Sequence, residues 1–335
     1  MVILSGGCAD KHAEKKAAWN TMMQPGNVRQ LFKLENLHNS DAKFYKNNII
    51  TNIGKVFYVY DKNGNVLKKY PQIKANWISA ISEDGLVLYS NDEKQIGVAK
   101  LDQDNNLVSN VIIMNCSKLA IDPSLVKVGS TYYFTVTVVD GTVNNSNPSV
   151  ENGNYTVKLY SADNIQDPKE IHYEADIVNA KNDIEDVDLM NMNNKLYLVY
   201  EKEIIDKGNS SICIKSSKDL SDAGIENWSG ERELLPPESD QEPADLFKNK
   251  NNTYTLYYSS DKEEPGSSYM GAKIYKALYN GRFELSKKDI AIPTINRKGN
   301  LLYDVQQTLY GAKYLFAQNY LTDCNLILEE QRIDH

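Results

Sequence analysis

Three acidic side chains recur at matching places in three stretches of the chain. Asp122, Asp186 and Glu242 each stand near the start of a short apolar segment, which a turn and a tyrosine-rich segment then follow. A protonated carboxyl group can donate a proton and an ionised one can accept a proton, so such a set can perform general acid–base catalysis. Gathering carboxylates costs electrostatic energy, which proteins tolerate mainly at functional sites. The pattern therefore indicates an acidic site.

Two plainer interpretations compete with catalysis. A single Asp at the start of a strand is more often a turn or cap residue, although three at equivalent positions are harder to explain in this way. Acids that line a channel can also bind a cation, so the pattern is compatible with a structural Ca²⁺. We expect no other cofactor, because the sequence has no CxxC motif or Cys/His cluster that would hold zinc.

The segments that carry these acids read as repeats of a small antiparallel sheet. Each has an acidic start, a strand, a turn with Gly or Asn, a Tyr-rich strand and then a third strand. Sheet repeats of roughly 30 to 65 residues predict an all-β propeller, because one such sheet cannot bury both of its faces alone. The clear copies begin at 121, 185 and 242, and weaker copies begin at 43, 77 and 302.

We expect one β-propeller domain over residues 28–335, preceded by a short helical or mobile leader over residues 1–27. Five blades are favoured slightly over six, because the first and last units look short enough to share one blade. Residues 28–34 are then the candidate closing strand. A double β-sandwich is the main competing fold, but it would not explain an acidic residue at the start of three consecutive units.

Composition excludes some classes of function. The formal net charge is −8, whereas nucleic-acid binding needs a basic face. Hydrophobic residues make up 41% of the chain, as in ordinary folded proteins. Cys116, Cys213 and Cys324 lie in or beside strand-like segments, where we expect small buried thiols and no disulfide framework. We expect a monomer.

The start of the chain bears on where the protein works. Leu4-Ser5-Gly6-Gly7-Cys8 looks like a bacterial lipoprotein box, although the leucine lies one place too far from the cysteine. The apolar stretch before it is too short for a signal peptide. We expect an extracytoplasmic protein, secreted or at the cell surface, with membrane attachment through a lipidated Cys8 as an open alternative. The sequence contains no run of 18 apolar residues, so we predict no membrane span.

The repeats resemble blades of glycoside hydrolase family 43. The resemblance lies in Asp122-Pro123-Ser124 before a Tyr-Tyr strand, in Glu185-Asp186-Val187-Asp188-Leu189, and in Glu242-Pro243-Ala244-Asp245. It covers about residues 119–280 and is a likeness of pattern. It implies a five-bladed propeller and an acid trio, in which an Asp is the base, a second Asp tunes the acid and a Glu is the acid.

Carried onto this chain, the resemblance implies that Asp122 is the base, Asp186 the tuning residue and Glu242 the acid. Glu185 is a rival for the acid, because its surroundings also resemble the acid motif of that family. The base of that family usually sits in the first blade, where Asp41 is the positional candidate, although the residues around Asp41 lack the motif.

Three further residues are candidates for binding substrate: Trp77, which could stack on a sugar ring, and Asp188 and Asp245, which follow the acids on the same strands. The leading hypothesis is a glycoside hydrolase that cleaves a poly- or oligosaccharide at the propeller mouth. The first alternative is a non-catalytic cell-surface propeller that binds carbohydrate or protein. An enzyme of other chemistry on the same scaffold is the second, since a fold does not determine a function.

Overall fold

In the computed structural model of the chain, the described residues are 28–332, apart from 36, 38, 82–83, 92–93, 142–152, 182, 205–207, 222–224, 297, 310 and 321–323. The predicted leader over residues 1–27 and Cys8 lie outside them, so lipidation stays a prediction. Within the described part, no helix is long and apolar enough to cross a membrane.

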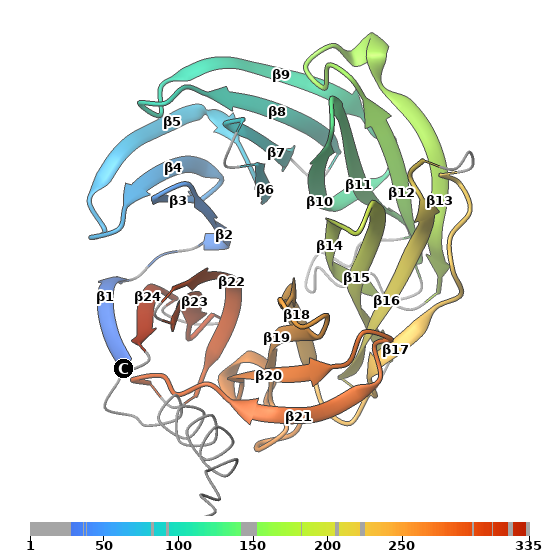
Figure 1. Cartoon of the computed structure of the whole chain (residues 1–335). Helices are drawn as coiled ribbons and strands as arrows, with labels where there is room; N and C mark the ends of the chain where they lie inside the picture. The colour runs from blue at the N-terminus through green and yellow to red at the C-terminus, as the bar shows by residue number, and fades with distance from the viewer. Residues whose placement is uncertain are drawn as a thin grey trace, which may run out of the picture.

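The described residues form six antiparallel sheets of four strands, which stand around a common axis like the blades of a propeller (Figure 1). Within each sheet the strands run outward from the axis, with the innermost strand listed first. The blades are, in turn, β2 (Asn39–Tyr45), β3 (Asn48–Ile53), β4 (Val56–Asp61) and β5 (Val66–Lys74); β6 (Trp77–Ile81), β7 (Leu86–Asn91), β8 (Gln95–Leu101) and β9 (Leu107–Asn115); β10 (Leu119–Val128), β11 (Thr131–Asp140), β12 (Asn154–Ala162) and β13 (His172–Ala180); β14 (Ile184–Met192), β15 (Lys195–Ile204), β16 (Asn209–Asp219) and β17 (Arg232–Leu235); β18 (Gln241–Lys248), β19 (Tyr254–Ser260), β20 (Lys273–Tyr279) and β21 (Leu285–Ala291); β22 (Asn300–Thr308), β23 (Gly311–Gln318), β24 (Asn325–Arg332) and β1 (Val28–Leu34).

The expected count of five blades is wrong, and the structure shows six. The predicted closing strand is confirmed, since β1 pairs antiparallel with β24, with Val28 opposite Gln331 and Leu34 opposite Leu326. The error came from joining the first and last units into one blade. Only β1 crosses to the last blade, and β2–β5 make a complete sheet of their own.

Neighbouring blades pack through apolar faces, and the tyrosines contribute strongly to this core. Phe134, Tyr200 and Phe316 are each fully buried within different groups of packed apolar side chains. Cys213 and Cys324 are buried as expected, whereas Cys116, also expected to be buried, is partly exposed. Because side chains alternate between the two faces of a strand, each blade can cover both of its neighbours.

Candidate active site

One mouth of the central channel holds a cavity of about 130 Å³, lined by residues of all six innermost strands. The structure brings most of the predicted site residues together here: the lining includes Asp122, Asp186, Glu242, Glu185, Trp77 and Asp188. Asp245 is not among the lining residues. Asp41 is, although its surroundings in the sequence lack the family motif.

β-Bulges near the start of the inner strands place the acids at the mouth. The pairing register shifts between Ile121 and Ser124 in β10, and between Glu185 and Asp188 in β14. A bulge bends its strand and changes the direction of a side chain. Asp122 and Asp186 occupy these bulges with φ of 45° and 49°, a left-handed conformation that Asp tolerates better than most residues and that is common at functional sites.

Asp41 is an acid of the cavity whose surroundings support a negative charge. Its carboxylate accepts hydrogen bonds from the backbone N–H groups of Ala42 (2.7 Å) and Ile78 (3.3 Å). The Lys43 Nζ lies 3.8 Å from it. Burial raises the pKa of Asp41, and Lys43 and both N–H groups counteract this rise.

Glu185, in contrast to Asp41, is surrounded by acidic side chains. Burial raises the pKa of Glu185 well above its usual value, and the charges of Asp183, Asp122, Asp186 and Glu203 add to the rise. The carboxyl groups of Glu185 and Asp183 also share a hydrogen bond, and two carboxyl groups can share one only if one of them holds a proton. Glu185 therefore keeps its proton to higher pH than an ordinary glutamate does.

The surroundings of Asp122 share features with those of both Asp41 and Glu185. Its carboxylate accepts a hydrogen bond from the backbone N–H of Asp186 (3.1 Å). Burial raises the pKa of Asp122 well above the usual range, and the neighbouring Asp186 and Asp41 raise it further. No cation is among the largest causes of the shift, so Asp122 is poorly suited to the part of an ionised base.

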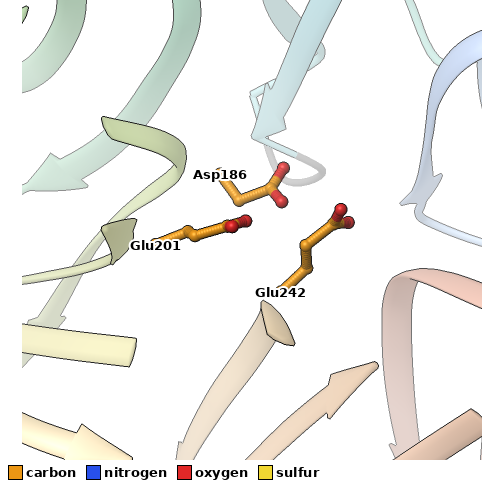
Figure 2. A group of neighbouring side chains, drawn as sticks. All are labelled: Asp186, Glu201 and Glu242. Carbon is orange, nitrogen blue, oxygen red and sulfur yellow. The ribbon is translucent and has the colours of Figure 1, made fainter. Parts of the chain in front are cut away.

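Figure 2 shows Asp186, Glu201 and Glu242 with their carboxyl groups directed into the same space. One oxygen of each lies within 4.8 Å of the others. Burial raises the pKa of Glu201 and Glu242 well above the usual range, with further rises from neighbouring acids, and raises the pKa of Asp186 to about 6. The spacing would also suit Ca²⁺ with ligands at about 2.3–2.6 Å.

A second, deeper layer of polar groups joins the inner strands to one another. Asp245 accepts a hydrogen bond from the backbone N–H of Val305 in the next blade (2.6 Å). Asp304 accepts a hydrogen bond from the backbone N–H of Phe44 (2.6 Å), which joins the sixth blade to the first. Asp245, predicted to bind substrate, therefore holds two blades together.

Ser124 makes an equivalent link between the third and fourth blades. Its Oγ accepts the N–H of Leu189 (2.9 Å) and donates to the Asp188 carboxylate (3.2 Å). Because the Asp188 carboxylate accepts this hydrogen bond, Asp188 helps to join the inner strands as well as to form the cavity wall.

Aromatic side chains form part of the wall. Trp77, predicted as a stacking residue, is partly buried and lines the cavity. Tyr269 and Tyr320, from connections outside the inner strands, lie beside each other with ring centroids 5.0 Å apart. Tyr269 also hydrogen-bonds Glu242.

Sequence reasoning missed four residues at this site: Lys43, Glu201, Tyr269 and Tyr320. Glu201 lies opposite Glu185 in the pairing of β14 with β15. Its only signal in the sequence is its place directly after the Tyr-rich strand of its blade. The tyrosines lie in connections, where no repeat pattern marks them.

Comparison with known proteins identifies the fold. No family model and no curated protein matches the sequence. An α-L-arabinofuranosidase from Lactobacillus brevis has a similar structure, with a TM-score of 0.51, 12% identity and coverage of 92% of this chain and 94% of that one. The WD40 repeats of RRP9 are as similar, with a TM-score of 0.51, 10% identity and coverage of 92% and 98%.

An endo-arabinase from Bacteroides thetaiotaomicron has a TM-score of 0.49 and 13% identity, with coverage of 77% of this chain and 93% of that one. The propeller fold implied by the resemblance to glycoside hydrolase family 43 is thus confirmed, as a likeness of fold at low identity. Because WD40 repeats match equally well, the chemistry must be argued from the cavity itself.

Proposed function

We propose that the protein is a glycoside hydrolase whose site is the acidic cavity at the propeller mouth. The observation that carries the proposal is the contrast between two of its acids. Asp41 has Lys43 and two N–H groups beside it, whereas Glu185 has four acidic neighbours. Two carboxyl groups whose environments push their pKa values apart are what acid–base cleavage of a glycosidic bond requires.

Asp41 is the better base. It projects from the first blade and Glu185 from the fourth, and these blades face each other across the axis of a six-bladed ring (Figure 1). This differs from the assignment by sequence pattern, which gave the part of base to Asp122. An inverting hydrolase needs its two carboxyl groups on opposite sides of the sugar, about 6.5–9.5 Å apart, to leave room for water.

In this mechanism Glu185 gives its proton to the glycosidic oxygen as the bond to the anomeric carbon breaks. Asp41 takes a proton from a water molecule, whose oxygen then forms the new bond to that carbon. Burial and the neighbouring acids, Asp183 first among them, raise the pKa of Glu185. Glu242, the acid by sequence pattern, lines the same cavity and is the alternative donor that the experiment below distinguishes.

The size of the cavity points to one sugar unit. Its volume is about 130 Å³, and a cavity of about 150 Å³ holds a benzene ring. Trp77, Tyr269 and Tyr320 supply aromatic surface against which a sugar could pack. We therefore propose cleavage at the end of a carbohydrate chain, with α-L-arabinofuranosides among the first substrates to test.

The test uses aryl glycosides of arabinose, xylose, mannose, galactose and fructose that carry either dinitrophenol or a poor leaving group. Glu185→Gln should lose turnover of the poor leaving group by at least about 100-fold and retain most of it with dinitrophenol, which leaves without a proton. Asp41→Asn should lose both, and Glu226→Gln, an exposed acid, should change neither. If Glu242→Gln shows this dependence on the leaving group and Glu185→Gln does not, Glu242 is the acid.

A non-catalytic propeller that binds carbohydrate or protein remains the second candidate. It is favoured by the links that Asp245 and Asp304 make between blades, because these give acids of the inner strands a structural task. Binding of a glycan without turnover of any of the glycosides above would select it.

A further inference from the structure

A second and larger cavity, of about 460 Å³, lies between the fifth and sixth blades. Most of its lining lies at the ends of strands opposite to those that carry the acids. Asn249, which lines it, follows the end of β18, about seven residues or about 23 Å along the strand from Glu242. Its volume falls in the range of about 300–1,000 Å³ typical of ligand sites.

The lining of this cavity differs from that of the acidic one. It consists mainly of amide, hydroxyl and tyrosine side chains, and no carboxylate is among the lining residues that the structure describes. This is notable in a chain with 45 Asp and Glu residues. The neutral hydrogen-bonding side chains include Asn249, Thr253, Thr255, Ser286, Gln307 and Gln331.

Part of this lining is held in place before any ligand arrives. The Asn249 Nδ2 donates to Thr253 Oγ1 (3.0 Å) and to Thr255 Oγ1 (3.1 Å). Thr255 is 6% exposed, and within the described residues no hydrogen bond from its hydroxyl to an acceptor is found. A buried hydroxyl that accepts but does not donate has one hydrogen bond left to make.

We propose that this cavity is a second carbohydrate site, which binds a short neutral oligosaccharide without cleaving it. A sugar hydroxyl donates and accepts hydrogen bonds, which matches amide and hydroxyl side chains that do the same. Tyr257, Tyr279 and Tyr314, with Leu278, supply the apolar part of the lining. The proposal rests on the proposed function for the class of ligand, but not on turnover.

The lining disfavours an anionic ligand. Lys276 is its one cationic side chain among the described residues, and burial, together with the nearby Lys287, lowers the pKa of Lys276. Phosphate or carboxylate recognition usually employs arginine or several cations. A neutral ligand needs no cationic partner, so a single buried lysine is sufficient for this lining.

The experiment uses the full chain with Asp41→Asn, so that no glycan is consumed, on an array of neutral plant, fungal and bacterial oligosaccharides. The best ligand is then titrated calorimetrically. Thr255→Val, which keeps the side-chain shape, should weaken binding about five- to tenfold. Ser286→Trp, at an exposed lining residue, should block it.

Trp77→Ala alters only the acidic cavity and should leave this binding unchanged. Binding lost in Trp77→Ala but kept in Thr255→Val and Ser286→Trp would place the glycan in the acidic cavity and overturn the proposal. No binding to any glycan on the array would overturn it too. Hydrolysis of aryl glycosides by Ser286→Trp tests the proposed function separately, so the two can fail independently.

Discussion

The Lys43 ammonium group lies 3.8 Å from the Asp41 carboxylate, and both side chains line the acidic cavity. Burial lowers the pKa of Lys43, but Asp41, Asp304, Asp245 and Asp188 raise it above its ordinary value. Acids from four blades thus act on one cation. Lys43 therefore stays charged, and it lowers the pKa of Asp41 against the rise that burial causes.

Replacing Lys43 with Met should therefore impair both activity and stability. Without the ammonium group Asp41 is a weaker acid, so the acidic limb of the kcat/KM profile should move to higher pH. Unfolding in urea should become easier by about 3 kcal/mol, the lower end for a broken buried ion pair, since about a third of the Lys43 side chain is exposed. Lys288→Met, which breaks a surface pair with Glu238, should cost at most about 1 kcal/mol. Equal losses in both variants would contradict the role given to Lys43.

The basic limb of the pH profile should belong to Glu185. A raised pKa means that Glu185 keeps its proton to higher pH than usual, and activity is lost as the pH rises through that value. After burial, Asp183 is the largest cause of the rise, followed by Asp122, Asp186 and Glu203. Asp183→Asn should move the basic limb to lower pH by about one unit and leave the rate on the acidic plateau nearly unchanged. A profile that keeps its basic limb would show that another group is the acid.

Glu329, in β24 and away from the cavity, should make stability depend on pH. Its side chain is fully buried, and burial raises the pKa of Glu329 to about 7, against an opposing N–H of Ile295. Because the folded pKa exceeds the unfolded one, stability is greatest below about pH 4.5 and falls as the pH rises to about 7.

Glu329→Gln removes this titration. At pH 8 the variant should be more stable than the parent by about 3 kcal/mol, and at pH 4 the two should be equal. Urea unfolding at both pH values measures the difference, with Glu226→Gln as the exposed control. A gain of the same size at both pH values would point to packing instead of ionisation.

Ser124→Ala should separate the structural links from the chemistry. It removes the acceptor of the Leu189 N–H and a donor to Asp188, and a buried group left without its partner costs about 1–3 kcal/mol. The free energy of unfolding should fall by this amount while both limbs of the pH profile stay in place. Ser221→Ala, at an exposed turn, should have little effect. A shifted limb would mean that Ser124 also tunes the catalytic acids.

The local pattern of the sequence determined the strands, the turns and the acidic starts of the repeats. It also predicted that Asp122, Asp186 and Glu242 converge at one mouth, because inner strands of a propeller converge at their leading ends. These features depend on alternation and turn chemistry over a few residues, which a single chain displays. The closing strand over residues 28–34 was predicted from the same kind of local pattern.

Tertiary structure alone decided the number of blades and the division of roles among the acids. The count depends on whether the first unit completes a sheet of its own, as β2–β5 do while β1 pairs with β24, and the local pattern does not state this. The roles depend on charges from other blades: Lys43 beside Asp41, and Asp183 and Asp122 beside Glu185. The pKa of a buried carboxyl group follows from its neighbours in space, and those neighbours exist only once the ring of blades has closed.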